Sequence, residues 1–486
     1  MNQASAVNEK TLDRTIAHCR ARNVVIPSLA LQKDPTLVPP SVRERLRQVG
    51  LWDIDPVNLF RITWKNEPVE RGGLYNAGNW IEFPSALTGV PARIIGLVGK
   101  YFPTGAHKVG AAFGCLVPRL VSGQFDPTTQ KAVWPSTGNY CRGGAFDCAL
   151  LGCPAVAILP EQMSRERFEW LRSIEAEVIA TPGCESNVKE IYDQCWEIRR
   201  TRPDCVVFNQ FEEFGNAAWH YHVTGSFVEE TFMRLAGRDD LRLSAFVSAT
   251  GSAGTIAAGD YLRTRFPAVR VVAAEALQCP TLLAFGFGAH RIEGIGDKHV
   301  PWIHNVRNTD LVVAVDDEQC LRLMRLFNED AGRSALENAG VPRATVHRLA
   351  DLGISGICNL VACIKTAKHY GLGGRDVLFT PLTDSMALYQ SRLKEQREQR
   401  GAYDAAAAGA DYAGCLAGIA PDWLRELSLA DRKALHNFKY FTWVEQQKRT
   451  VEDLNALWEP DFWQERFGEA AAWDRRIDEF NRRVGA

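Results

Sequence analysis

The sequence predicts a layered α/β fold, because short apolar runs alternate with longer segments of helical spacing between about residues 92 and 390. Runs that are apolar on both faces are typical of parallel strands covered by helices. The runs that we interpret as strands are 92–99, 131–134, 155–160, 177–182, 205–210, 243–250, 269–275 and 376–382. Segments with helical spacing include 164–174, 187–200 and 319–330. We therefore expect mostly parallel sheets that are covered by helices.

Composition limits the function classes that remain. The chain has 486 residues, of which 46% are hydrophobic, so we expect two or three domains. A formal net charge of −2 gives no reason to expect nucleic acid or an anionic membrane as a partner. The thirteen cysteines are scattered and show no C-x-x-C spacing, which argues against a disulfide framework or a metal site. With no secretory signal or membrane-spanning run in the sequence, we expect a soluble, cytoplasmic protein.

The two ends of the chain differ from its middle. We expect residues 1–60 to form a helical or irregular decoration, residues 61–395 the core, and residues 396–414 a low-complexity linker. Residues 415–486 carry five tryptophans among charged residues, which predicts a helical C-terminal extension. Aromatic side chains mostly serve burial, so we interpret this extension as packing on the body or on a second subunit rather than as a ligand site.

The most informative segment is 103–108, which ends in Lys108 and opens an apolar helical pattern. A lysine at the start of an apolar helix is costly to bury. A covalent role would explain it, since desolvation frees the amine to condense with an aldehyde. Taken alone, however, a lysine at a helix start is more often structural.

A second segment, 135–139, follows the strand at 131–134 and also precedes a helical pattern. Its hydroxyls, glycine, amide and backbone N–H groups would suit a carboxylate. The same residues would equally make an ordinary N-terminal cap of a helix.

A third segment, 251–255, joins the strand at 243–250 to a helical pattern. Its small residues would let backbone amides and hydroxyls surround a phosphate. A dinucleotide fold is the competing interpretation, because Glu275 follows at the usual distance of a ribose-binding acid. The glycine spacing is not G-x-G-x-x-G, however, and that interpretation leaves Lys108 unexplained.

Together these segments resemble the fold-type II pyridoxal-phosphate enzymes, and most of all the cysteine synthase and cystathionine β-synthase family. The resemblance covers roughly residues 76–393 and implies a two-lobed fold with pyridoxal 5'-phosphate as cofactor. Connecting segments also match, namely 160–167, 209–225, 290–301 and 353–356. Several ordered matches are far more specific than any one of them.

The resemblance also implies a role for each matched residue. Lys108 would form the internal aldimine and act as the catalytic base. The residues that would hold the cofactor are Lys108, Asn139 at the ring hydroxyl, the phosphate loop Gly251, Ser252, Ala253, Gly254 and Thr255, and Thr383 at the pyridine nitrogen. The residues that would hold the substrate carboxylate are Ser136, Thr137, Gly138, Tyr140 and Gln210.

The residue that faces the pyridine nitrogen decides the chemistry. A hydroxyl there, unlike a carboxylate, does not force the nitrogen to be protonated, so the ring is a weaker electron sink. Thr383 therefore favours loss of the α-proton coupled to departure of a β-leaving group, which gives an aminoacrylate. Asp384 is adjacent in the sequence, and a carboxylate at that place would reverse this argument.

The chain also departs from the family pattern. Tyr140 stands where cysteine synthases have a small threonine, and Ala253 replaces a usual glycine. The 104–108 segment resembles that of tryptophan synthase β subunits, but Ser136 occupies the place of their activating glutamate. Condensation with indole is therefore not expected.

We expect β-replacement, in which a nucleophile such as a thiol adds to an aminoacrylate formed from O-acetylserine, serine or a cysteine-like substrate. The alternative within enzymes is β-elimination, which releases a keto acid and ammonia. A cofactor-bearing interaction protein and a nicotinamide-dependent oxidoreductase remain open as other classes; the latter predicts that Lys108→Ala leaves cofactor binding intact. The family habit implies a homodimer.

Overall fold

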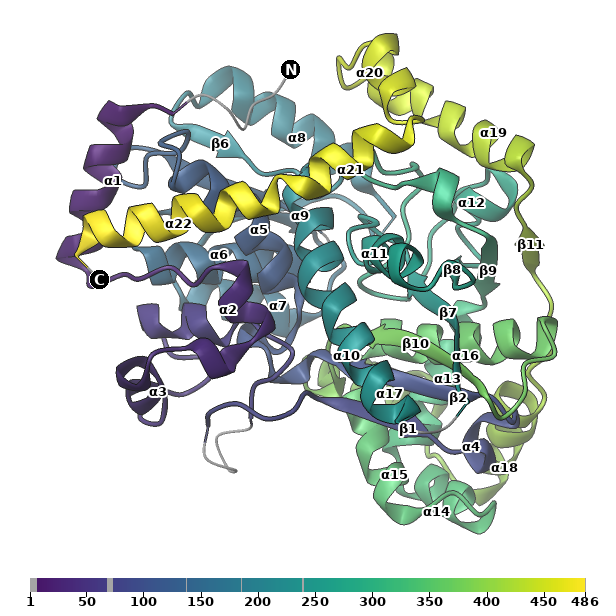
Figure 1. The fold of residues 1–486 in the computed structure, drawn as a ribbon. Coiled ribbons are helices and arrows are strands. Elements are labelled where there is room, and N and C mark those ends of the chain that lie inside the picture. The colour runs from purple at the N-terminus through teal and green to yellow at the C-terminus, as the bar shows by residue number, and fades with distance from the viewer. Residues whose placement is uncertain (1–6, 68–72, 137, 185, 238–239, 486) are drawn as a thin grey trace.

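The chain forms two β-sheets that consist mainly of parallel strands (Figure 1). The computed structural model describes residues 7–67, 73–136, 138–184, 186–237 and 240–485. The larger sheet has the order β1-β2-β10-β7-β8-β9-β11, and the smaller has the order β5-β4-β3-β6. The strand bounds are Trp80–Phe83 (β1), Arg93–Val98 (β2), Lys131–Pro135 (β3), Ala155–Pro160 (β4), Glu177–Thr181 (β5), Cys205–Val207 (β6), Arg242–Ala249 (β7), Arg270–Ala276 (β8), Leu311–Val315 (β9), Asp376–Leu382 (β10) and Leu424–Glu426 (β11). This arrangement confirms the predicted fold class.

The smaller sheet is parallel throughout, whereas the larger one has antiparallel edges. Strands β1 and β11 each run antiparallel to their single neighbour, and the pairs between them are parallel. Each run predicted as a strand contains one, although the run 205–210 is extended only to Val207. Strands β1, β9 and β11 were not predicted.

Helices cover the sheets and account for the apolar strands. The helices before the C-terminal region are Glu9–Ala21 (α1), Leu29–Lys33 (α2), Pro40–Leu46 (α3), Ser85–Thr88 (α4), Lys108–Leu120 (α5), Asn139–Leu151 (α6), Arg165–Ser173 (α7), Val188–Thr201 (α8), Phe214–Trp219 (α9), Gly225–Ala236 (α10), Ala257–Arg265 (α11), Thr281–Ala284 (α12), Asp317–Asn328 (α13), Asp330–Asn338 (α14), Arg343–Arg348 (α15) and Ile354–His369 (α16). Helices α7, α8 and α13 confirm the three predicted helical segments. Every residue of β10 is buried, as expected for a central strand with helices on both faces.

The C-terminal region is helical and is joined to the core through both sheet and helix contacts. Its helices are Gln390–Arg400 (α17), Ala405–Asp411 (α18), Leu429–Lys439 (α19), Val451–Ala456 (α20), Pro460–Gly468 (α21) and Ala470–Val484 (α22). The segment expected as a linker thus contains α18, and β11 of the extension pairs with β9 of the core. Helices α21 and α22 cross one side of the molecule and reach α1 (Figure 1).

Hydrogen bonds and buried tryptophans tie α22 and its neighbours to the core. Asp474 accepts from the backbone N–H of Leu29 at 2.7 Å, and Asn481 accepts from that of Ile26 at 3.0 Å. The side chains of Trp463 and Trp473 are buried. These contacts agree with the interpretation that most of the aromatic side chains of the extension serve packing.

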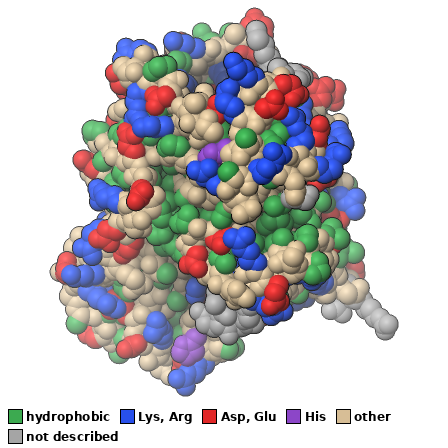
Figure 2. Space-filling view, turned by 90° about the vertical axis from the view of Figure 1, so that its left-hand side faces the viewer, with side chains coloured by type: hydrophobic (Ala, Val, Ile, Leu, Met, Phe, Trp, Pro, Cys, Tyr) green, Lys and Arg blue, Asp and Glu red, His purple; other side chains and the backbone are tan. Residues whose placement is uncertain are grey.

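The surface has interspersed charges. Lys and Arg side chains alternate with Asp and Glu on the face shown in Figure 2, around a more hydrophobic central region. Among the residues that the structure describes, no helix has the length and apolarity needed to cross a bilayer.

Candidate active site

Loops that follow strands of both sheets meet at one narrow cavity. Carboxyl ends of parallel strands commonly carry the ligand sites of α/β proteins. The residues that line the cavity are Lys108, Ser136, Asn139, Tyr140, Gln210, Phe211, Gly251, Ser252, Gly294, Gly296 and Thr383. The structure therefore brings together most of the site residues predicted from the sequence. Thr137 lies outside the described residues.

Lys108 is the first residue of α5 and points its amine at the phosphate-loop segment. Its Nζ donates to Ser252 Oγ at 3.0 Å. The turn that precedes it is strained, because Thr104 has a φ of +67° although its side chain is β-branched. This turn connects β2 to α5 and places Lys108 at the cavity.

The loop 251–255 leaves β7 and leads into α11. Ser252 Oγ accepts from Asn216 Nδ2 at 3.1 Å, and the same amide nitrogen donates to Gln210 O at 3.0 Å. Gly254 packs against this amide, since a Cβ there would lie 1.9 Å from Asn216 Oδ1. Asn216 therefore sets the path of the loop, although no sequence motif marked it.

Ala253 has a φ of +60°, the left-handed region that favours glycine. This explains in physical terms why glycine is usual at the position. Alanine in place of glycine at this position therefore costs conformational free energy of the backbone. It does not change the residues that line the cavity.

Asn139 is oriented by a buried carboxylate. Its Nδ2 donates to Asp384 Oδ2 at 2.6 Å, and the Tyr389 hydroxyl donates to the same oxygen at 2.6 Å. Arg167 in turn donates to the Tyr389 hydroxyl at 2.9 Å and pairs with Glu293 at 3.1 Å. Burial raises the pKa of Asp384, and the nearby Arg167 opposes that rise.

Thr383 lines the cavity, while Asp384 points to Asn139 instead. A hydrogen bond of 3.2 Å joins Thr383 Oγ1 to His107 Nε2. Burial, with the neighbouring Lys108 charge, lowers the pKa of His107 to about 3, so its imidazole is neutral at pH 7. The structure therefore presents a hydroxyl on this side of the cavity. No carboxylate is among the described lining residues.

Ser136, Gly138 and Tyr140 each make hydrogen bonds or packing contacts that fix their positions. Ser136 Oγ accepts from the Gly138 backbone N–H at 2.9 Å. Gly138 has a φ of +148°, and a Cβ there would lie 2.3 Å from Arg167. The Tyr140 hydroxyl donates to Phe208 O at 3.2 Å, which fixes the direction of this side chain.

Some lining residues had no predicted role. Phe211 belongs to the 209–225 segment, and Gly294 and Gly296 belong to the 290–301 segment. Both segments matched the family pattern, and this match is the signal by which these residues could have been predicted. Gly138, Ala253, Gly254 and Thr255 are near the cavity in sequence but are not among its lining residues.

Glu275 does not occupy the place that a dinucleotide site would need. Its carboxylate accepts from the backbone N–H groups of Leu282 at 2.9 Å and Leu283 at 2.8 Å. The side chain is buried and therefore serves the local fold at α12. This removes the observation that supported a nicotinamide-dependent interpretation.

The residues present fit pyridoxal phosphate. Lys108 supplies an amine for a covalent link, and the 251–255 loop precedes a helix start that suits a phosphate. Asn139 Oδ1 is buried without a hydrogen-bond partner in the protein, so it can accept a hydrogen bond from a bound group.

Comparison with known proteins identifies the class. The family model "Pyridoxal-phosphate dependent enzyme" matches residues 100–358, more than half of the chain. The chain therefore belongs to the pyridoxal-phosphate-dependent enzymes and, within them, to the cysteine synthase family.

The curated relatives support this family, and the solved structures show the same fold. A cysteine synthase of Staphylococcus aureus is 28% identical over 280 residues, which cover 57% of this chain and 82% of the relative. Cysteine synthase B of Campylobacter jejuni is 30% identical over 220 residues, covering 45% and 71%. The structure of an O-acetylserine dependent cystathionine β-synthase from Helicobacter pylori has a TM-score of 0.54 at 23% identity, covering 64% of this chain and 94% of that one. A cysteine synthase from Entamoeba histolytica has a TM-score of 0.56 at 18% identity, covering 68% and 92%.

Proposed function

We propose that this enzyme catalyses β-replacement on a small β-substituted amino acid such as O-acetylserine, serine or a cysteine-like substrate. The observation that carries the proposal is the position of the Lys108 amine, 3.0 Å from Ser252, in a cavity that Thr383 lines with a hydroxyl. The cysteine synthases among its relatives support the same reaction class.

Pyridoxal phosphate, when bound, supplies the electron sink for the negative charge that develops at the substrate Cα. We propose that Lys108 holds the cofactor covalently, Asn139 contacts its ring hydroxyl, and residues 251–255 hold its phosphate. Asp384 and Tyr389 would keep the Asn139 amide in one orientation through the two hydrogen bonds of 2.6 Å.

Lys108 would also move the proton. With substrate bound, the Lys108 amine would lie at the cavity and would take the proton from Cα as the β-leaving group departs. Ser136, Thr137 and the neighbouring backbone amides would hold the substrate carboxylate, with Tyr140 and Gln210 beside them. These contacts fix the substrate so that Cα faces Lys108.

Water decides between replacement and elimination. A narrow cavity that includes the apolar rings of Phe211 and Tyr140 would keep water from the activated Cβ until the nucleophile arrives. We propose replacement on this ground. The family resemblance supports a homodimer and a cytoplasmic location as finer expectations, and sedimentation analysis of the purified protein would test the first.

The test is turnover by the holoenzyme with each of O-acetylserine, serine and cysteine, in the presence and absence of sulfide or another thiol. We expect a new amino acid that carries the nucleophile, detected by mass spectrometry, and no accumulation of keto acid while the nucleophile is present. Lys108→Ala is expected to abolish product formation. Lys100→Ala is the matched control, because that lysine pairs with Asp351 and its side chain is 40% exposed.

Keto acid and ammonia released without incorporation of the nucleophile would identify β-elimination instead. A protein that binds pyridoxal phosphate but turns over none of these amino acids would favour an interaction role and contradict the proposal.

A further inference from the structure

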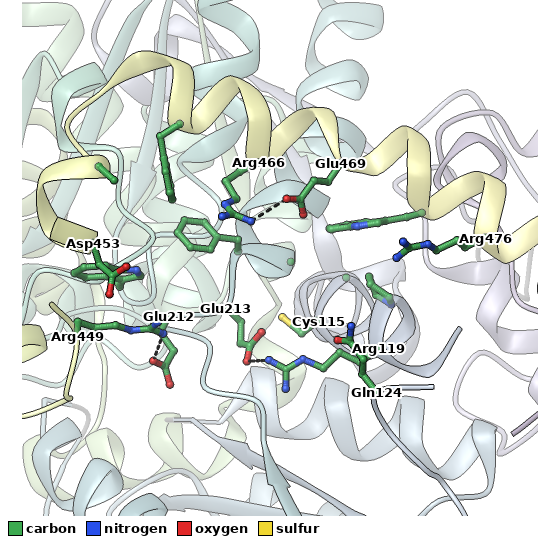
Figure 3. A pocket seen from close by; sticks show the side chains of 18 of the residues that line it. Cys115, Arg119, Gln124, Glu212, Glu213, Arg449, Asp453, Arg466, Glu469 and Arg476 are labelled. Carbon is green, nitrogen blue, oxygen red and sulfur yellow. Dashed lines mark hydrogen bonds and ion pairs between the residues drawn. The ribbon is translucent and has the colours of Figure 1, made fainter. Parts of the chain in front are cut away.

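A second cavity, of about 570 Å³, lies where the C-terminal extension covers the core (Figure 3). Its volume is within the range of small-molecule sites. Its lining residues come mainly from α5, the 212–215 turn and the 449–476 region, with Gln124 and Trp302 in addition: Gly114, Cys115, Pro118, Arg119, Gln124, Glu212, Glu213, Phe214, Gly215, Trp302, Arg449, Thr450, Asp453, Ala456, Phe462, Arg466, Glu469, Trp473 and Arg476. None of these residues lines the active-site cavity.

Charges of both signs line this cavity in equal number. The cations are Arg119, Arg449, Arg466 and Arg476, and the anions are Glu212, Glu213, Asp453 and Glu469. Three pairs face it, at 2.5 Å between Arg119 and Glu213, 2.6 Å between Arg449 and Glu212, and 2.8 Å between Arg466 and Glu469. A ligand with a single sign of charge would therefore meet as many repelling groups as attracting ones.

Apolar surface completes the wall. The Arg449 guanidinium lies 5.5 Å from the Trp302 ring centroid, and that of Arg466 lies 5.2 Å from the Phe462 ring centroid. Aromatic rings beside a few polar groups are typical of sites that bind small organic molecules. A guanidinium group that lies against an aromatic ring is held in one position, from which it can bind the carboxylate of a ligand.

We propose that this cavity binds a small zwitterionic amino acid, which acts as an effector of the active site. Its carboxylate would contact Arg466 in place of Glu469, and its ammonium group would contact Asp453 or Glu212. A ligand that carries both charges is the one that a wall of balanced charge favours.

Breaking the ion pair between Arg466 and Glu469 would cost little free energy. The side chains of Arg466 and Glu469 are 22% and 26% exposed, and they lie three residues apart in sequence. Partly exposed pairs of this kind contribute little to stability, so a ligand carboxylate competes with Glu469 on favourable terms. Glu469 is therefore an internal competitor for the ligand.

Two elements connect this cavity to the active site. Helix α5 carries Lys108 at its first residue, and Gly114 and Arg119 of the same helix line the second cavity. The 210–216 segment also contributes residues to both cavities, since Gln210 lines the active site and Glu213 lines the second cavity. Ligand contact at Glu212 or Arg119 would therefore act on elements that also hold active-site groups.

The two shared elements are in backbone contact, so they move together. A Cβ on Gly215 would lie 2.1 Å from Gly114 O, and one on Gly114 would lie 2.4 Å from Gly215 O. Asn216, next in sequence, holds Ser252 at 3.1 Å. The regulatory part of this proposal rests on the proposed function, whereas the binding part does not.

Binding is tested on the full chain with its active site blocked. Holoenzyme is treated with borohydride, which fixes the cofactor on its lysine, so an added amino acid cannot bind covalently there. Calorimetric titration with serine, cysteine, methionine and tryptophan is compared with titration by inorganic phosphate, citrate and putrescine. We expect saturable binding of at least one amino acid, and at least tenfold weaker binding of the ions of single sign.

Three single substitutions are expected to weaken, tighten or leave unchanged the binding of the amino acid. Arg466→Gln is expected to weaken amino-acid binding at least tenfold, while Glu469→Gln is expected to tighten it several-fold by removing the competitor. A misfolded variant would not bind more tightly. Arg475→Gln is the matched control, because Arg475 is exposed, lies next to Arg476 and does not line the cavity.

The proposal is overturned if no amino acid binds the blocked protein, if phosphate or citrate binds as tightly as the amino acids, or if Arg466→Gln and Arg475→Gln have the same affinity. Binding without any change in turnover of unblocked enzyme would overturn the regulatory part. Failure of the proposed function is recognised separately, since the titration does not require turnover.

Discussion

Replacing Gly254 by alanine tests whether Asn216 sets the path of the phosphate loop. The new Cβ would lie 1.9 Å from Asn216 Oδ1, and contacts of Cβ atoms under 3.0 Å are essentially never seen. The two groups must therefore separate by about 1 Å. Asn216 is fully buried, so it has no free space into which it could rotate without losing partners.

The cost follows from the bonds that Asn216 makes. Its Nδ2 donates to Ser252 Oγ at 3.1 Å and to Gln210 O at 3.0 Å. A shift of about 1 Å lengthens both beyond hydrogen-bond distance, and each buried bond lost costs about 1–2 kcal/mol. We expect Gly254→Ala to lower the free energy of unfolding of the cofactor-free protein by about 2–4 kcal/mol. Because Ser252 moves as well, affinity for pyridoxal phosphate should fall at least tenfold.

Urea unfolding of the cofactor-free protein measures the first effect, and equilibrium dialysis against pyridoxal phosphate measures the second. Gly251→Ala is the control, since the nearest atom to its Cβ would lie 3.4 Å away and it lines the cavity itself. It should leave unfolding near wild type but weaken cofactor binding. In the double variant with Asn216→Ala, Gly254→Ala should cost much less. A stable Gly254→Ala protein with wild-type cofactor affinity would refute this reasoning.

Three further changes test other parts of the account. Asp384→Asn replaces the carboxyl group that accepts from the Asn139 amide, so dialysis should show about tenfold weaker cofactor binding; unchanged affinity would contradict a positioning role. Ala253→Gly relieves the backbone strain of a φ of +60° and should raise the free energy of unfolding by about 0.5–1 kcal/mol in urea titrations. A lower free energy of unfolding would show that the alanine is not strained. Burial lowers the pKa of Lys439 from 10.5 to about 7, so the unfolded chain binds more protons between these pH values and stability rises with pH. Lys439→Met should reduce that slope by up to about 1.4 kcal/mol per pH unit, and an unchanged slope at pH 7–9 would contradict the assignment.

Most of the correctly predicted strands are buried on both faces, where a run without polar residues carries the signal, whereas β5 and β6 are less buried. Strand β10 is buried along its whole length and was predicted with its observed bounds. Strand β9 is equally apolar, and the same pattern could have marked it. Strand β11 carried no such signal, since none of its residues is buried. The run 205–210 leaves the sheet after Val207, and its last residue, Gln210, lines the active-site cavity.

The low-complexity stretch shows how composition misleads when propensity is neglected. Its alanines suggested a linker, yet alanine has the highest helix propensity of all residues. Asp404 caps the helix that forms, accepting from the Ala407 backbone N–H at 2.9 Å. Ala408 of this helix is fully buried.

The residues that line the candidate site were predictable from motifs. The residues that position them through hydrogen bonds were not. Lys108, Asn139 and Thr383 stand in segments that match a family pattern, and all three line the cavity. Asn216 and Tyr389 act through hydrogen bonds across the fold, which no local pattern records. The second cavity depends likewise on how α21 and α22 lie against the core, which the tryptophan content alone does not determine.

The most direct test of the central claim is to identify which residue holds the cofactor. Holoenzyme is reduced with borohydride and digested, and the peptides are analysed by mass spectrometry. We expect a pyridoxyl group on Lys108 and none on Lys100, with loss of the label in Lys108→Ala. A label on another lysine, or a protein that takes up no pyridoxal phosphate, would contradict this claim.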